Sequence, residues 1–293
     1  MTRDAIDVID QSLAYASSWA DFVYVYDTGS TDGTWETVLQ FADRDNRVVP
    51  FRHEAIVFWE GIRSVVFNHF RNRARDGDWF VKVDEDEFYH IPPPEFVRHY
   101  LRPHETCVYG QTYEFRLTVE EAARYRHQRN INADRKRPID ERRRYYQPLE
   151  YSEHRLFRYR ESMVWTPDNS FPYNAGYVAR RRIPIRHYPH RDPEQLAQRL
   201  RLRRMLLRFL PTGSYPHWHA GTWRDFLIDS ADPSLKYWQP GESLPLIDLH
   251  SHLAPALKRA AQRIAHGALL PILDRLRKPF PPDFQPVKLT SDV

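Results

Sequence analysis

The sequence predicts an α/β fold with a mostly parallel, mixed sheet and helices on both of its faces. Helical and strand patterns alternate over residues 1–117, and segments long enough to be crossover helices separate successive strands. Two of these strands run directly into polar residues, at Asp27 and at Asp84. Ligands of such sheets bind beyond the carboxyl ends of the strands, so we expect both ends to open onto the same edge.

The first four elements follow from hydrophobic periodicity. Residues 5–18 and 33–43 each place apolar side chains at helical spacing, which predicts two amphipathic helices. Residues 22–26, with the sequence FVYVY, and residues 47–51 are short and rich in β-branched and aromatic side chains, which is typical of strands. The polar sequence DTGSTDGT, residues 27–34, lies between the first strand and the second helix.

The next elements continue this alternation. Residues 62–75 favour a helix, and residues 79–83 form an apolar strand that leads into four consecutive acids. Residues 92–101 predict a helix with prolines in its first turn, where their missing N–H is tolerated. Residues 106–117 alternate apolar and polar side chains, which predicts another strand.

The later part of the chain has a different pattern. Residues 118–144 are rich in arginine and predict a helical insertion, whereas residues 155–159 and 162–165 resemble short strands. Residues 181–210 predict a strand, a loop and then a helix capped near Asp192.

These patterns divide the chain into two parts. We expect one α/β domain over residues 1–210, with the insertion inside it. Residues 211–293 hold many of the prolines and predict an appendage of loops and two helices.

Composition limits the classes of protein that need to be considered. The 293 residues are enough to bury a sizeable core, and no segment approaches the roughly 18 continuous apolar residues of a membrane span. Cys107 is the only cysteine, so an intrachain disulfide is excluded. The first residues, MTRDAIDVIDQSL, lack the apolar block of a signal peptide, and we expect a cytoplasmic protein.

The acids at residues 84–87, with the sequence DEDE, are the strongest chemical signal. If the strand continues to Asp84, the side chains of Asp84 and Asp86 project to the same side. Two carboxylates at a rigid strand end favour Mg²⁺ or Mn²⁺, with a diphosphate completing the coordination shell. The alternative is a solvated acidic turn, and four consecutive acids then require cations nearby to offset their repulsion.

Three motifs together carry a resemblance to a known family. A strand ending in DTGSTDGT, a helix ending in RN and the sequence DWFVKVDEDEF occur in this order. In this arrangement the chain resembles the nucleotide-binding half of the family 2-like glycosyltransferases of the GT-A fold. The resemblance covers roughly residues 3–95 and is weaker at residues 155–158 and 187–195.

The resemblance implies a role for each matching residue. Asp27 matches the family's aspartate that meets the base or ribose of the nucleotide, and Asp84, Glu85 and Asp86 match its DxD element. The first Asp of that element tends to bind ribose, and the last binds the metal. The remaining residues that the resemblance assigns to the nucleotide sugar are Gly29, Ser30, Arg71 and Asn72.

The reaction that the resemblance implies is transfer of a sugar from a nucleoside-diphosphate sugar to a hydroxyl acceptor, with inversion at the anomeric carbon. The acceptor can be a glycan, a lipid-linked molecule or another hydroxyl compound. A carboxylate would deprotonate the acceptor. Asp168 stands near the place of that base in related members, and Glu153 and Glu114 are rivals.

A histidine often completes the metal shell in GT-A enzymes, and His187 lies at a suitable place. His190 is its nearest competitor, and packing in a loop is the alternative role for either one.

The chain departs from the family in one respect. Members begin with a buried strand that ends near the sequence NE, whereas here Arg3 and Asp4 stand at that place. We therefore expect the first central strand to be absent, through an upstream start, a truncated sheet or a degraded copy.

Two basic segments, residues 124–144 and 199–208, favour a second interpretation. A non-catalytic GT-A-like module could bind nucleotides, or use these arginines to bind an anionic surface. A membrane that carries the acceptor is one such surface, and peripheral contact with the inner membrane face follows from it. Nucleic acid is the less favoured partner.

Overall fold

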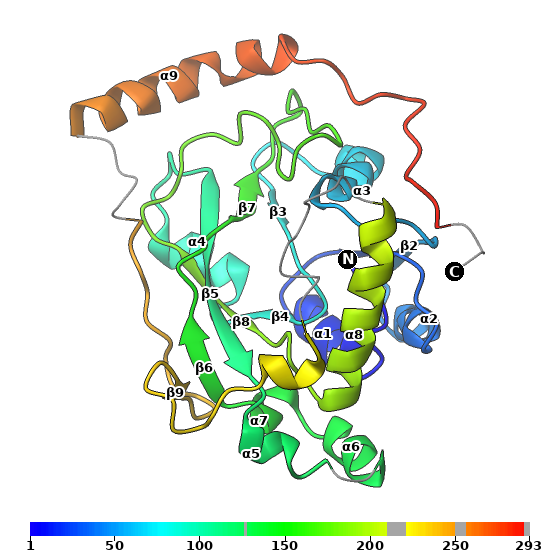
Figure 1. Ribbon diagram of the computed structural model, residues 1–293. Coiled ribbons are helices and arrows are strands. Elements are labelled where there is room, and N and C mark those ends of the chain that lie inside the picture. The colour runs from blue at the N-terminus through cyan, green and yellow to red at the C-terminus, as the bar shows by residue number, and fades with distance from the viewer. Residues whose placement is uncertain (126–127, 210–220, 250–255, 290–293) are drawn as a thin grey trace.

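The computed structural model describes residues 1–125, 128–209, 221–249 and 256–289 (Figure 1). Its strands form one two-stranded and one seven-stranded sheet, and helices surround them. The chain is therefore a mixed α/β protein, as the sequence predicts.

The amino-terminal elements agree with the predicted ones. They are α1 (Ile9–Ser17), β1 (Val23–Asp27), α2 (Thr34–Arg44) and β2 (Val48–His53). β1 and β2 pair in parallel, and α1 and α2 pack against them through one apolar cluster. Its buried members are Ile9, Leu13, Val25, Val38 and Val48.

The next segment differs from the prediction where β3 ends and the consecutive acids begin. Its elements are η1 (Glu60–Ile62), α3 (Arg63–Phe70), η2 (Arg71–Arg73), β3 (Trp79–Val81), β4 (Glu87–Tyr89) and α4 (Pro93–Tyr100). β3 ends at Val81, before the acids, and the N–H of Glu87 donates to the carbonyl of Asp84 at 3.1 Å. Asp84 and Asp86 therefore lie on a turn between two strands, and the expectation that they extend one strand is wrong.

The large sheet is built around β5 (Cys107–Arg116). It pairs antiparallel with β6 (Tyr145–Pro148) and β7 (His154–Arg158), and parallel with β8 (Ile183–His187). β7 also pairs with β3, and β8 pairs with β4, both antiparallel.

Parallel pairing is the minority in this fold. Among the ladders between strands of the described residues, only β1–β2 and β5–β8 are parallel, so the expectation of a mostly parallel sheet is wrong. The physical reason is that the later strands return beside β5 and β3 in the opposite direction. Local side-chain patterns do not determine which distant strands pair.

The arginine-rich insertion is helical, as predicted. It forms α5 (Val119–Ala122), α6 (Gln128–Arg135) and α7 (Ile139–Arg142), whereas the strand expected at residues 162–165 does not form. α8 (Pro193–Leu206) begins where the sequence indicates, because Asp192 Oδ1 accepts from the N–H of Gln195 at 2.9 Å.

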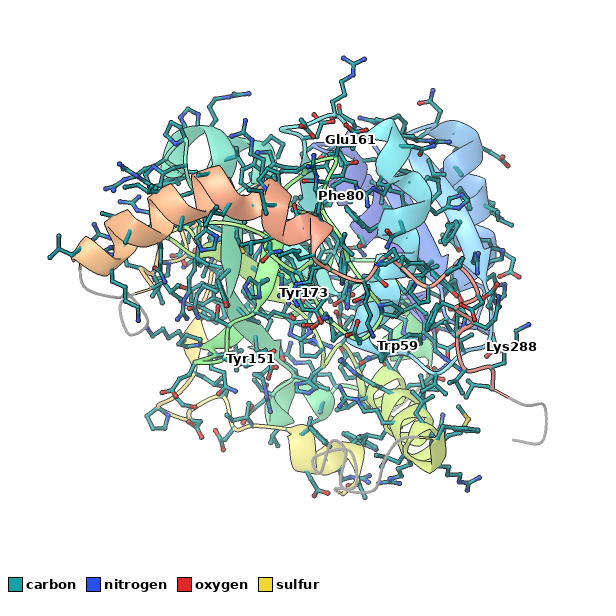
Figure 2. The ribbon with its side chains drawn as sticks, turned by 90° about the horizontal axis from the view of Figure 1, so that it is seen from above. Trp59, Phe80, Tyr151, Glu161, Tyr173 and Lys288 are labelled. Carbon is teal, nitrogen blue, oxygen red and sulfur yellow. The ribbon has the colours of Figure 1, made fainter. Side chains whose placement is uncertain are left out.

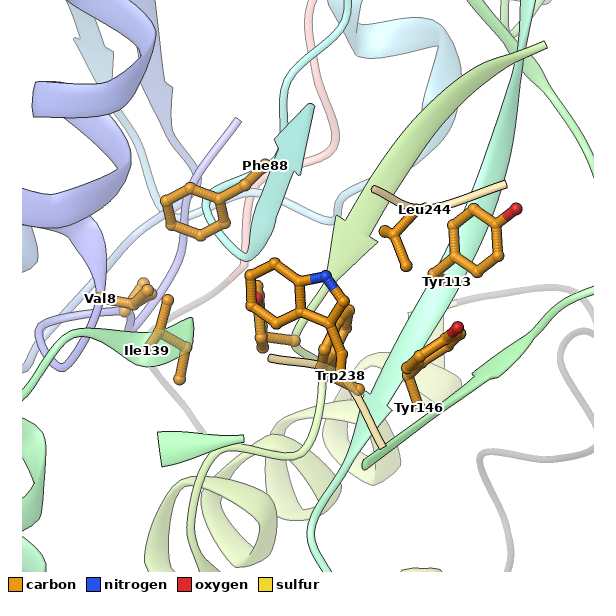
Figure 3. Close-up of a cluster of buried hydrophobic side chains, with 10 residues drawn as sticks. Val8, Phe88, Tyr113, Ile139, Tyr146, Trp238 and Leu244 are labelled. Carbon is orange, nitrogen blue, oxygen red and sulfur yellow. The ribbon is translucent and has the colours of Figure 1, made fainter. Parts of the chain in front are cut away.

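The C-terminal part contributes to the main core. It contains η3 (Leu207–Phe209), η5 (Trp223–Phe226), β9 (Lys236–Tyr237) and α9 (Ala256–Arg275). Trp238, next to β9, packs among aromatic and aliphatic side chains from the rest of the chain (Figure 3). α9 lies outside the sheet (Figure 1). It is attached to the segment between β7 and β8 through Asp274, which accepts from Arg160, Ser162 and Asn174.

Candidate active site

The carboxyl ends of β1 and β3 lie near each other, although the two strands belong to different sheets and not to one sheet as expected. The amino group of Met1 donates to the carbonyl of Val83 at 3.0 Å, and Thr2 forms a parallel bridge with Asp27. Two consecutive residues thus contact the ends of both strands. Asp27 is itself bridged to Thr2, and Asp84 directly follows Val83, so the two carboxylates lie in the same part of the fold.

Asp27 is fully buried and uses only one of its two oxygens within the protein. Oδ1 accepts from the N–H groups of Gly29 at 2.8 Å and Ser30 at 2.7 Å. Oδ2 is buried and has no hydrogen-bond partner among the described residues. A buried carboxylate oxygen without a donor is costly, so this atom indicates a place for a ligand donor.

Gly29 makes the turn after β1 possible. Its φ of +104° lies in the region that favours glycine, and a Cβ there would come within 2.7 Å of the Cα of Ala55. Gly29 therefore has a structural role in this turn, whereas contact of Gly29 with a nucleotide stays a prediction.

The hydroxyl groups after β1 attach the amino-terminal segment to this turn. Ser30 Oγ accepts from the N–H of Asp4, and Thr34 Oγ1 accepts from the N–H of Ala5, both at 2.8 Å. Asp4 Oδ1 in turn accepts from the N–H of Thr31 at 2.8 Å. Much of the polar sequence DTGSTDGT thus has a structural role, and only part of it is left to meet a ligand.

Three of the four consecutive acids have internal cationic partners. Asp84 accepts from Arg63, and Glu87 is bound by both terminal nitrogens of Arg155. Burial raises the pKa of Asp84, but Arg63, the amino terminus and Arg155 together hold it well below its usual value. These cations offset the repulsion that the sequence DEDE creates.

Three basic side chains surround Asp86. Its Oδ1 lies 3.5 Å from Nε2 of His187, and its Oδ2 lies 3.5 Å from Arg191 and 3.4 Å from Arg199. Burial raises the pKa of Asp86, but His187, Arg199 and Arg191 outweigh it and lower the pKa far below its usual value. Asp86 therefore stays ionised although it is buried.

Glu85 differs from its neighbours. It lines the cavity between β1 and β3, and burial together with Asp86 and Asp84 raises its pKa to about 8. A glutamic acid that holds its proton near neutral pH can donate a hydrogen bond to a ligand.

His187 lies beside the acids, whereas His190 does not. His187 ends β8, which places it next to Glu87 on β4 and next to Glu114 on β5. Its Nδ1 is 4.0 Å from Glu114 Oε2, so one imidazole lies between the carboxylates of Asp86 and Glu114. His190 is buried against Phe226, with its ring centre 5.7 Å away.

Arg71 and Asn72 lie apart from this group. Arg71 follows α3, where it donates to the carbonyls of Met163 and Glu161, and Asn72 is exposed. The arginine that contacts Asp84 is instead Arg63, at the opposite end of the same helix.

Sequence reasoning missed both Arg63 and Arg191. Arg63 stands in the first turn of a predicted helix, and Arg191 stands just before the cap of another. Both are buried cations, and buried arginines occur where carboxylates pair with them. Arg63 carries no motif that could have identified it, whereas Arg191 lies within residues 187–195, where the family resemblance is weak.

Asp168 lies on an exposed turn beside the loop that leads into α3. Trp59 Nε1 donates to the carbonyl of Pro167 at 2.8 Å, and the hydroxyls of Thr166 and Tyr173 donate to Asp168. Figure 2 labels Trp59 and Tyr173, which come from different parts of the chain to hold this turn. The hydrogen bond from Thr166 is the main reason why the pKa of Asp168 is lowered.

The two rivals for the base are paired with cations. Glu153 accepts from Lys82 at 3.0 Å and lies 2.6 Å from Arg155, whereas Glu114 is bound by Arg116. Both carboxylates are therefore already engaged by cations within the protein, whereas hydroxyl groups donate to Asp168.

The residues near Asp27 and Asp84 fit a divalent cation in part. No group of three or more His, Cys, Asp or Glu in a metal-binding arrangement occurs among the described residues. Asp86 and His187 are nevertheless adjacent, and a carboxylate with an imidazole suits Mn²⁺. One or two protein ligands completed by substrate phosphates are common for Mg²⁺ and related ions. The oxygen and nitrogen donors present therefore suit a cation that arrives with a diphosphate.

Comparisons with models of protein families and with curated proteins find no match for this chain. Within the part of the chain that the structure describes, no helix combines the length and apolar character needed to cross a membrane.

Proposed function

We propose that this protein is a metal-dependent glycosyltransferase that moves a sugar from a nucleoside-diphosphate sugar to a hydroxyl group. The observation that supports this proposal best is the unpartnered Oδ2 of the fully buried Asp27, in the part of the fold that also carries the acids at residues 84–87. A donor from the base or ribose would satisfy this oxygen. The GT-A resemblance of the sequence assigns the same role to Asp27.

Asp86 and His187 would hold the divalent cation, with Asp84 beside them. When bound, such a cation offsets the charge of the leaving diphosphate. Cationic side chains of the protein would also help to offset the charge of the diphosphate. Arg191 and Arg199 lie within 3.5 Å of Asp86 Oδ2, and they raise the positive potential at the place where a diphosphate would lie.

Asp168 is our proposal for the base that deprotonates the acceptor hydroxyl. An aspartate is ionised at neutral pH, as a base must be, and the exposure of Asp168 leaves it open to an acceptor. Its turn packs on Trp59, next to Glu60, which contacts Arg63 and Lys82. Direct displacement by that hydroxyl would invert the anomeric carbon.

One observation favours a second candidate function. The cations that neutralise Asp84, Asp86 and Glu87 come from the chain itself, so the acidic turn is electrostatically satisfied without an added ion. A non-catalytic module that binds nucleotide through Asp27 would need no metal ion at this turn. Mn²⁺-dependent binding of the donor separates the two candidates.

The basic segments are largely used within the protein. Arg135 binds Asp192 through two nitrogens at 2.8 and 2.9 Å, and Arg142 and Arg143 are buried. Leu206 is also buried, so it cannot enter lipid while α8 packs as it does. Peripheral membrane contact through other residues, and a cytoplasmic location, stay predictions.

A thermal-shift screen of nucleotide sugars, with and without Mn²⁺, tests the proposal. We expect at least one donor to raise the midpoint of unfolding, and the rise to depend on Mn²⁺. A rise with free nucleotide that is independent of Mn²⁺ would favour the non-catalytic module. No rise with any donor would contradict both.

A further inference from the structure

A large cavity separates β1 from β3. Its volume is about 1080 Å³, and its two side walls include Val23–Val25 from β1 and Trp79–Val81 from β3. Figure 2 labels Phe80, one of the residues of the β3 wall. The helices α1 and α3 cover its two faces. We call this space the strand slot.

The backbone edges that face the strand slot lack a ladder partner. Among the described residues, β1 pairs in a ladder with β2, and β3 pairs with β7, in each case on the side away from the slot. The N–H of Val23 and the carbonyl of Asp27 bond toward β2, so the alternating residue Tyr24 directs its N–H and carbonyl into the slot.

The same alternation applies to β3. The carbonyl of Asp78 and the N–H of Lys82 bond toward β7, so Trp79 and Val81 direct their backbone groups into the slot. Val83 continues this series, and its carbonyl accepts from the amino group of Met1. Buried backbone groups in proteins are almost always paired, and two parallel rows of them match the two edges of one strand.

The side chains that line the strand slot indicate that a strand inserted there would carry apolar residues. The face toward α1 is lined by Ile9, Leu13 and Ala16, and the face toward α3 by Val66, Phe67 and Phe70. A strand with apolar residues on both faces is typical of the middle of a sheet covered by helices.

The contacts of Met1 and Thr2 indicate the direction and the position that an inserted strand would have in the slot. The bridge between Thr2 and Asp27 is parallel, and Thr2 donates to the carbonyl of Tyr26 at 3.1 Å. Met1 and Thr2 therefore occupy the carboxyl end of the slot in the register of an inserted strand. A peptide bond before Met1 would turn its amino group into an amide N–H, which can still donate to Val83.

We propose that the strand slot accepts one extended, apolar peptide strand of about five residues, the length of β1, parallel to β1 and joined through its carboxyl end to Met1. The strand would close β1 and β3 into one continuous sheet. This inference rests on backbone geometry and does not depend on glycosyl transfer.

The test adds five residues before Met1 of the full chain. One variant carries five β-branched apolar residues, a second carries an equally long Gly-Ser segment, and a third has a proline at the centre of the apolar segment. The Gly-Ser segment lacks apolar side chains, and the proline cannot complete the ladder. The three variants are compared by thermal unfolding and by hydrogen exchange of fragments that cover residues 23–27 and 79–83.

We expect the apolar segment alone to raise the midpoint of unfolding by about 5 °C or more. It should also slow exchange at the amides of Tyr24, Trp79 and Val81 by about tenfold or more. Equal behaviour of the apolar and Gly-Ser variants would overturn the proposal. Protection by the same apolar peptide added separately, without any effect of the fused segment, would overturn the junction at Met1.

Discussion

His187 Nε2 lies 3.5 Å from Asp86 Oδ1, and this contact joins the end of β8 to the acidic turn after β3. Burial lowers the pKa of His187, but Asp86 above all, with Glu87 and Glu114, raises it above its usual value. Asp86 thus stabilises a cation in a buried place. The same position could hold a divalent ion, which is why this pair is central to the proposed function.

Asp27→Asn tests the unpartnered oxygen directly. Asparagine keeps an oxygen for the N–H groups of Gly29 and Ser30, but it places an amide nitrogen where Oδ2 stands. A hydrogen bond to a charged group contributes about 1.5–3 kcal/mol, so affinity for free nucleoside diphosphate should fall roughly tenfold to a hundredfold. Calorimetric titration measures this affinity.

The matched control for this variant is Asp43→Asn, because Asp43 is exposed on α2. We expect the control to bind as the unchanged protein does. Unchanged nucleotide affinity in Asp27→Asn would leave Asp27 as a residue of the turn alone.

Arg63→Met should destabilise the protein through the carboxylates that it leaves behind. Arg63 is buried and contacts Glu60 and Asp84, so its loss leaves charges without their main partner. Breaking such a pair typically costs about 3–5 kcal/mol, measured here as the free energy of unfolding in urea.

Adding Asp84→Asn to Arg63→Met removes one of these unpaired charges. The double variant should therefore recover roughly 1 kcal/mol or more relative to Arg63→Met alone. If the two substitutions destabilise the protein additively, Arg63 and Asp84 do not act as a pair.

The lowered pKa of His90 leads us to expect that the stability of the protein depends on pH in the weakly acidic range. Burial, with Arg186, lowers the pKa of His90 to about 4 from an ordinary 6.5, and His90 Nε2 accepts from the N–H of Leu244 at 3.1 Å. Since the folded state favours the neutral ring, its contribution is complete above pH 6.5. It is lost as the pH falls from about 6.5 to about 4.

His90→Gln should flatten the change of unfolding free energy between these pH values, measured by urea titrations across the range. Some slope should persist, because burial lowers the pKa of His154 to about 4 as well. His99→Gln, at an exposed residue of α4, is the matched control. An unaltered slope in His90→Gln contradicts the assignment.

Trp238→Ala tests whether the C-terminal part belongs to the main core. Trp238 is 3% exposed and belongs to the same buried cluster as Phe115, Tyr146 and Tyr188. Figure 3 labels Trp238 and Tyr146 of this cluster. Truncating a buried tryptophan costs about 3–5 kcal/mol in the free energy of unfolding. Its neighbour Tyr237 is 50% exposed, so Tyr237→Ala should cost less than about 1 kcal/mol. Equal effects would show that Trp238 does not support the core.

The local elements of the fold were predictable, whereas the pairing of strands was not. α1, α2 and the Asp192 cap follow from periodicity and from capping chemistry, both of which depend on nearby residues. β4 and β9 are short, and they become strands only through their partners β8 and β6. No local pattern specifies such partners, and the mostly parallel sheet was predicted wrongly for this reason.

The candidate site was predictable where one segment carries its chemistry. The acids at residues 84–87 stand together in the sequence, and the structure also brings His187 beside Asp86. Arg63 and Arg191 could not be identified, because they reach these acids only after folding. The end of β3 was also misplaced, since the turn that closes at Glu87 depends on the pairing of β4.

Calorimetric titration of a nucleoside-diphosphate sugar, with and without Mn²⁺, into the unchanged protein and Asp86→Asn tests the central claim most directly. We expect Mn²⁺ to tighten binding at least tenfold in the unchanged protein, which corresponds to about 1.4 kcal/mol, and to have no effect in Asp86→Asn. The variant must first show the same folded-state circular dichroism, because Asp86 also pairs with Arg191 and Arg199. Equal affinity with and without Mn²⁺ in the unchanged protein, or equal tightening in both proteins, would contradict the account.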